Sequence, residues 1–164
     1  MLKNRAAYFG VFTALALIFS YIESLIPINF GIPGVKLGLA NLLIVIFLYK
    51  RSAPEALILS IVRIVLAGFL FGNLFSIIYS LAGGIVSLFM MTLMKKSERF
   101  SIMGVSIVGG VSHNIGQLLV AMVVVETYSI GYYFPVLLIS GVITGLLIGI
   151  TANEVLKRIS AIHF

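Results

Sequence analysis

Residues 101–125, SIMGVSIVGGVSHNIGQLLVAMVVV, form a long apolar stretch without a single Asp, Glu, Lys or Arg. About 18 or more consecutive apolar residues are enough for an α-helix to cross the ~30 Å hydrocarbon core of a bilayer. The whole chain is 61% hydrophobic and 10% charged, with a mean hydropathy of +1.20. Because 164 residues cannot hide that much apolar surface from water, the sequence predicts an all-α integral membrane protein.

Apolar segments of this kind recur along the chain and predict a single transmembrane domain of six helices over residues 1–164. The predicted segments are approximately 5–26, 37–49, 53–71, 74–94, 101–125 and 134–156. The second segment is short, since its ~13 residues span only ~20 Å. It is therefore a half-helix, a re-entrant segment or a helix that begins earlier than residue 37.

Basic residues lie in four clusters between the apolar segments and orient the predicted bundle. These clusters are Lys3 with Arg5, Lys50 with Arg51, Lys95 and Lys96 with Arg99, and Lys157 with Arg158. With six crossings all four clusters fall on one side, which the positive-inside rule assigns to the cytoplasm. The sequence thus predicts a bacterial cytoplasmic-membrane protein with both termini inside. The clusters form no continuous basic patch, so no nucleic-acid partner is expected.

The composition argues against an intrinsic enzyme. The chain has no Cys, no Asp and only five Glu, which are well separated in sequence. No acid pair is close enough along the chain to hold Mg²⁺ against a diphosphate, and no G-x-x-x-x-G-K-[ST] motif for ATP is present. We therefore expect no catalytic residues, no metal site and no cofactor.

Arg63 lies in the middle of the third apolar segment. Placing an arginine at the bilayer centre costs ~2.5–3.5 kcal/mol on insertion scales, so its side chain should face the interior and have a partner. One interpretation is a counter-charge for an anionic ligand. The other is a structural ion pair with Glu23 or Glu126, or hydrogen bonds to helix carbonyls.

The fifth segment carries a polar stripe, because Gly109, His113, Gln117 and Ala121 recur every four residues and share one helix face. Asn114 lies beside that stripe. Polar groups are unfavourable against lipid, so they should face the bundle interior. His113, Asn114 and Gln117 are predicted to line a ligand site, and interhelical hydrogen bonding is the alternative.

Further polar residues gather on the predicted outer side. Glu23 lies near the end of the first segment, and Lys36 and Asn41 flank the start of the second. We predict that Lys36 and Asn41 lie at the mouth of the site and that Glu23 also contributes to it.

Small residues form two stripes at four-residue spacing, which lets helices approach closely in lipid. One comprises Ala6, Gly10 and Ala14, and the other comprises Gly141, Gly145 and Gly149. Packing within the chain is the more common role of such stripes. The first stripe is alternatively a docking face for a partner subunit.

Two motifs, PGVKLGLAN at 33–41 and SHNIGQ at 112–117, resemble those of the Gx transporter family. That family is often labelled heptaprenyl diphosphate synthase component I and is similar to the substrate-binding S components of energy-coupling factor (ECF) transporters. The resemblance implies binding of a vitamin or other small molecule near the outer face. It also implies docking through the first helix, often by an A-x-x-x-A pattern, onto a coupling membrane subunit driven by cytoplasmic ATPases.

The expected function is therefore an S-component-like subunit that takes up a small solute, anionic or cofactor-like. Prenyl diphosphate synthases resemble one another in aspartate-rich Mg²⁺ motifs, and this chain has no Asp. The family label is thus compatible only with a non-catalytic accessory subunit of isoprenoid or quinone metabolism, which is the second hypothesis. A structural membrane partner in a redox complex, with a dry interior, is the third.

Overall fold

The computed structural model describes residues 2–25 and 38–160, and in these ranges the chain is almost entirely helical. Its elements are α1 (Leu2–Leu25), α2 (Leu39–Lys50), α3 (Ala53–Phe71), α4 (Leu74–Lys96), α5 (Ile102–Val124), the 3₁₀ helix η1 (Tyr128–Tyr133) and α6 (Phe134–Ser160). The six predicted helical segments are confirmed, with ends that differ by a few residues. Five helices are long and apolar enough to cross a membrane, and α2 is the shorter one.

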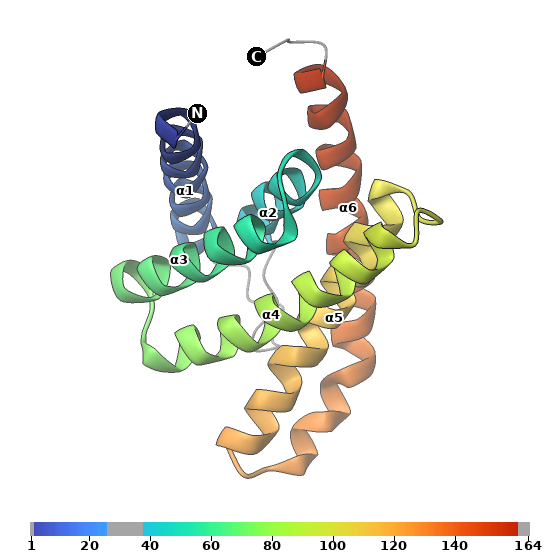
Figure 1. Cartoon of the computed structure of the whole chain (residues 1–164). Helices are drawn as coiled ribbons and strands as arrows, with labels where there is room; N and C mark the ends of the chain where they lie inside the picture. The colour runs from blue at the N-terminus through green and yellow to red at the C-terminus, as the bar shows by residue number, and fades with distance from the viewer. Residues whose placement is uncertain (1, 26–37, 161–164) are drawn as a thin grey trace.

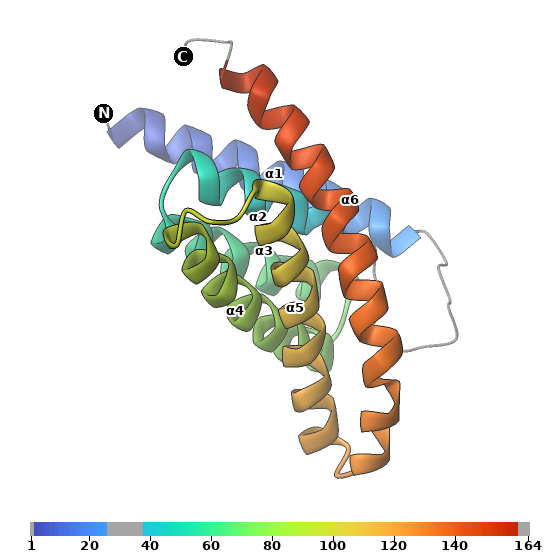
Figure 2. The same cartoon turned by 90° about the vertical axis from the view of Figure 1, so that its right-hand side faces the viewer.

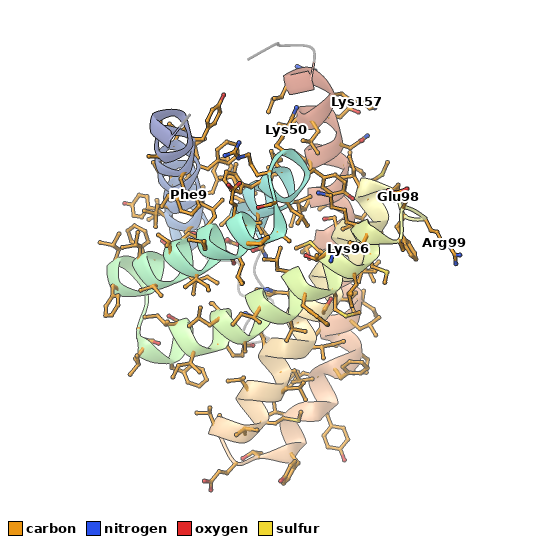
Figure 3. The ribbon with its side chains drawn as sticks, viewed as in Figure 1. Phe9, Lys50, Lys96, Glu98, Arg99 and Lys157 are labelled. Atoms are coloured by element: carbon orange, nitrogen blue, oxygen red, sulfur yellow. The ribbon has the colours of Figure 1, made fainter. Side chains whose placement is uncertain are left out.

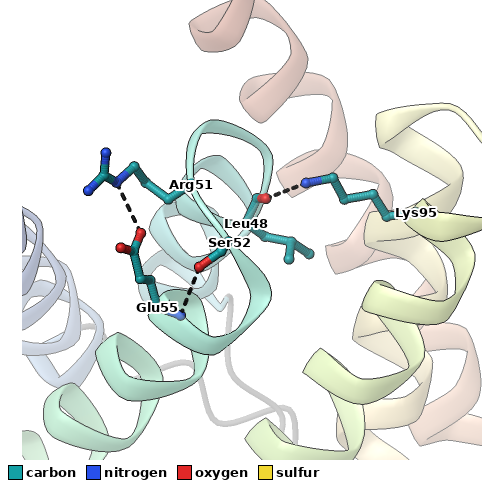
Figure 4. Close-up of polar contacts among 5 residues, drawn as sticks. All are labelled: Leu48, Arg51, Ser52, Glu55 and Lys95. Carbon is teal, nitrogen blue, oxygen red and sulfur yellow. Dashed lines mark hydrogen bonds and ion pairs between the residues drawn. The ribbon is translucent and has the colours of Figure 1, made fainter.

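Polar caps set several of the helix ends. Ser52 accepts a hydrogen bond from the Glu55 backbone N–H at 3.4 Å, which caps α3 (Figure 4). In the tight turn between α3 and α4, Asn73 and Ser76 form a reciprocal capping box with N···O distances of 2.8 and 3.0 Å. Each cap satisfies backbone N–H groups that have no partner within the helix. The short connections therefore turn the chain back sharply and keep consecutive helices adjacent.

Helices α5 and α6 pack closely because glycines remove side chains from their contact. A Cβ added at Gly145 would lie 2.7 Å from Ile107 Cα, and one added at Gly149 would lie 2.7 Å from Met103 Cα. At Gly141 the nearest atoms are also α5 backbone. The Gly141, Gly145 and Gly149 stripe thus packs within the chain, as small-residue stripes commonly do.

Helix α2 lies at the centre of the hydrophobic core, against α1, α3 and α6 (Figures 1 and 2). Seven of its twelve residues are buried. The Phe47 ring packs edge-on against Phe9 and Phe12 of α1, with ring centroids 5.8 and 5.0 Å apart. A helix that is buried on most sides needs apolar residues all round, which explains why α2 is apolar except for Asn41 and the C-terminal Tyr49 and Lys50.

Basic side chains gather toward one end of the molecule. The labelled Lys50, Lys96, Arg99 and Lys157 all lie in the upper half of Figure 3, the half that also holds the ends of the chain in Figure 1. The Lys95 ammonium lies over the Tyr49 ring. The same ammonium donates a hydrogen bond to the Leu48 carbonyl at 2.6 Å (Figure 4). This bond satisfies a carbonyl near the C-terminus of α2, where a cation is favourable, and ties α4 to α2.

Candidate functional site

A cavity of about 140 Å³ lies among the helices and is lined by all six of them. Of the seven residues predicted to bind a ligand, six line it. They are Glu23, Asn41, Arg63, His113, Asn114 and Gln117. Lys36 lies outside the described residues. Four helices (α1, α2, α3 and α5) therefore bring together residues that are as far as 94 positions apart in sequence (23 to 117).

Arg63 forms the charged wall of the cavity. Its Nη2 donates to the Asn41 side-chain oxygen at 2.7 Å, and its buried Nε has no hydrogen-bond partner among the described residues. Glu23 interacts with the guanidinium electrostatically, yet no ion pair within 4.0 Å joins the two in the described part of the chain. The hydrogen-bond partner of Arg63 is thus a neutral amide, and this leaves part of the guanidinium available.

Glu23 connects the end of α1 to the start of α2. Its Oε1 accepts a hydrogen bond from the Gly38 backbone N–H at 2.5 Å. Gly38 is the N-cap of α2 and has φ +73°, a left-handed conformation that favours glycine. Its carbonyl in turn accepts from the Asn41 N–H at 2.8 Å. The Glu23 carboxylate therefore positions the helix turn that presents Asn41 to Arg63.

Helix α5 supplies a further wall of the cavity, which carries no Lys, Arg, Asp or Glu. Gln117 is buried, with 3% of its surface exposed, and His113 and Asn114 are half-buried. The Asn114 side-chain N–H donates to the Leu137 carbonyl of α6 at 2.7 Å. An amide that donates one hydrogen bond still has a carbonyl oxygen and a second N–H to offer. The predicted polar stripe of α5 thus faces the bundle interior, and Asn114 serves both interhelical bonding and the cavity wall.

Gly83 of α4 determines how close this wall comes to its neighbour. A Cβ at Gly83 would lie 2.8 Å from Gln117 Cγ and 3.0 Å from His113 Cε1. On the other helix, a Cβ at Gly116 would lie 2.9 Å from the Ala82 carbonyl oxygen. Because Gly83 and Gly116 have no side chains, α4 and α5 can approach closely enough for His113 and Gln117 to pack against α4.

Hydroxyl groups that were not predicted to belong to the site complete the lining. They are Ser20, Ser24, Ser76, Ser80 and Thr144. The Ser20 hydroxyl oxygen is buried without a hydrogen-bond partner in the described ranges. Single hydroxyls are common in apolar helices, but Ser20 with Ser24 and Ser76 with Ser80 repeat at four residues. That spacing places each pair on one helix face and is the signal that could have found them.

A family model described as heptaprenyl diphosphate synthase component I matches residues 12–155. The chain belongs to this family. No curated protein and no solved structure matches it. The matched range includes every predicted ligand-binding residue, and it confirms the family suggested by the motifs at 33–41 and 112–117.

The predicted docking stripe of this family member lies outside the cavity. Ala6, Gly10 and Ala14 are all exposed on α1. A Cβ added at Gly10 would meet nothing within 4 Å, in contrast to the glycines of α5 and α6. The first stripe therefore does not serve helix packing within the described chain, whereas the second stripe does.

Proposed function

We propose that this chain is an S-component-like membrane subunit that binds a small solute in the cavity beside Arg63 and takes part in its uptake. The observation that carries the proposal is the polar cavity among the helices of a bundle that is apolar outside. Such a cavity, with a few convergent polar groups, is the usual form of a small-molecule site. Ionisable residues inside membrane segments are rare and commonly mark a solute pathway.

The proposed setting is the cytoplasmic membrane of a bacterium. The five long apolar helices fit the span of a bilayer. Helix α2 is shorter, but it is surrounded by α1, α3 and α6 and so needs little contact with lipid. The gathering of basic side chains toward one end supports a topology with both termini in the cytoplasm.

In this proposal the chain does not hydrolyse ATP. Its sequence holds no P-loop and no Asp, so the energy for transport comes from an ECF-type coupling membrane subunit and its cytoplasmic ATPases. The exposed stripe of Ala6, Gly10 and Ala14 supports α1 as the docking face, because small residues permit close approach of a partner helix.

Gly10→Leu is expected to weaken association with the coupling subunit by about tenfold or more, since it fills the space that a partner helix would occupy. The stability of the chain alone should not fall, because nothing lies within 4 Å of the new Cβ. Co-purification of the coupling subunit measures the effect. Val123→Leu, at an exposed site on α5, is the matched control. Unchanged association of the Gly10→Leu variant would contradict docking through this face.

The second candidate function is a non-catalytic accessory subunit of isoprenoid metabolism, and the description of the family favours it. A strain that lacks the chain distinguishes the two functions. If the chain takes part in transport, this strain should leave one compound of the growth medium unconsumed, while prenyl diphosphate synthase activity in its extracts is unchanged. Loss of the synthase activity with normal consumption of every medium compound would instead support the accessory role.

A further inference from the structure

Two polar atoms in the cavity wall need a partner that the described residues do not supply. Arg63 Nε and Ser20 Oγ are both buried, and neither has a hydrogen bond among those residues. Both residues line the same cavity, on α3 and α1. Buried polar atoms in native proteins are nearly always paired, so these two atoms show that the described residues leave part of the hydrogen-bonding capacity of Arg63 unused beside the cavity.

The guanidinium of Arg63, rather than the balanced charge of the lining as a whole, favours an anionic acceptor. Arg63 is the only Lys or Arg in the described lining, and Glu23 is the only acid. The Glu23 carboxylate is hydrogen-bonded to the Gly38 N–H rather than to Arg63. Asn41, whose side-chain oxygen accepts the hydrogen bond from Arg63 Nη2, adds no charge. A carboxylate that accepts from a guanidinium forms a stronger hydrogen bond than a neutral acceptor does.

The size of the cavity limits the rest of the molecule. Its volume of about 140 Å³ is close to the ~150 Å³ of an engineered apolar cavity that accommodates benzene. A space of this volume holds roughly one six-membered ring.

We propose that the cavity binds a compact monoanion, about the size of one six-membered ring, whose carboxylate pairs with Arg63. The remainder of the molecule contacts the uncharged wall formed by Asn114 and Gln117. This inference rests on the proposed function, because it names the substrate class of the same site.

Three near-isosteric probes test the charge and the size together: benzoate, benzamide and benzylamine. Their binding to the full chain in lipid nanodiscs is measured by calorimetric titration at millimolar concentrations. Benzoate is expected to bind about tenfold more tightly than benzamide, because a charged acceptor is stronger, and benzylamine is expected to bind weakest. Arg63→Gln should abolish this order. Arg99→Gln removes the same charge from an exposed site and should leave it unchanged.

Asn41→Asp provides a second variant that keeps the size of the side chain. A carboxylate at the position of the Asn41 oxygen would neutralise Arg63 and lower benzoate affinity while benzamide affinity stays the same. Equal binding of benzoate and benzamide by the wild type, or tightest binding of benzylamine, would overturn the charge assignment. Absence of binding by all three probes would overturn the size assignment. The two proposals can fail separately. If the chain has no role in transport, the consumption assay shows no difference while the order of probe affinities is unchanged.

Discussion

Gly145→Ala is expected to destabilise the protein by about 3 kcal/mol, because the new methyl group would overpack a contact between two backbones. The added Cβ would lie 2.7 Å from Ile107 Cα and 2.8 Å from the Ser106 carbonyl oxygen. Neither atom belongs to a side chain that can rotate away, so α6 must separate from α5 along its length. The midpoint of thermal unfolding in mild detergent measures the change.

Gly10→Ala is the matched control, since it makes the same substitution where nothing lies within 4 Å of the new Cβ. Alanine is favoured over glycine in a helix interior by up to ~1 kcal/mol, so this variant should be as stable as the wild type or slightly more stable. Equal destabilisation by the two substitutions would show that the close contact of α5 and α6 is not what makes Gly145 necessary.

Arg63→Ala is expected to reduce solute consumption by at least about tenfold, toward that of the strain without the chain. The substitution removes the only guanidinium in the described part of the cavity wall, and hydrogen bonds to charged groups contribute ~1.5–3 kcal/mol each. The measurement is the rate at which complemented cells consume the medium compound that the deletion strain leaves behind. Abundance in the membrane should not fall, because insertion of an arginine at mid-bilayer is itself unfavourable.

Arg99→Ala is the corresponding control at an exposed position and should consume the compound at the wild-type rate. Arg63→Lys separates charge from geometry, since lysine keeps the positive charge but lacks the planar fork that pairs with a carboxylate. We expect it to recover part of the rate. Wild-type consumption by Arg63→Ala cells would mean that Arg63 is a structural residue, as its bond to Asn41 alone could explain.

The order and type of the helices could be predicted from the sequence because each long apolar run is interrupted by a polar cap or a charged cluster. Ser52, Asn73 and Ser101 each cap the helix that follows them. The central place of α2 could not be predicted in the same way. Its shortness was visible, but burial of Phe47 against Phe9 and Phe12 depends on how distant helices pack.

The cavity residues could be predicted where a charged or polar residue interrupts an otherwise apolar helix. Arg63 is a charge in an apolar helix, and His113 and Gln117 share one face at four-residue spacing. The pairing of Arg63 with Asn41 was not foreseen, because Glu23 and Glu126 are the more obvious partners for a cation. Ser20 was missed because a hydroxyl in an apolar helix is ordinary until its burial beside a cavity is known.

Mass spectrometry of small molecules released from the gently purified protein tests most directly whether the cavity is a solute site. The account predicts one defined compound, present near one molecule per chain in the wild type and absent from the Arg63→Ala variant. It further predicts a monoanion that is small enough for the cavity of about 140 Å³. A wild-type protein that releases no compound, or one that the Arg63→Ala variant retains equally well, would contradict the account.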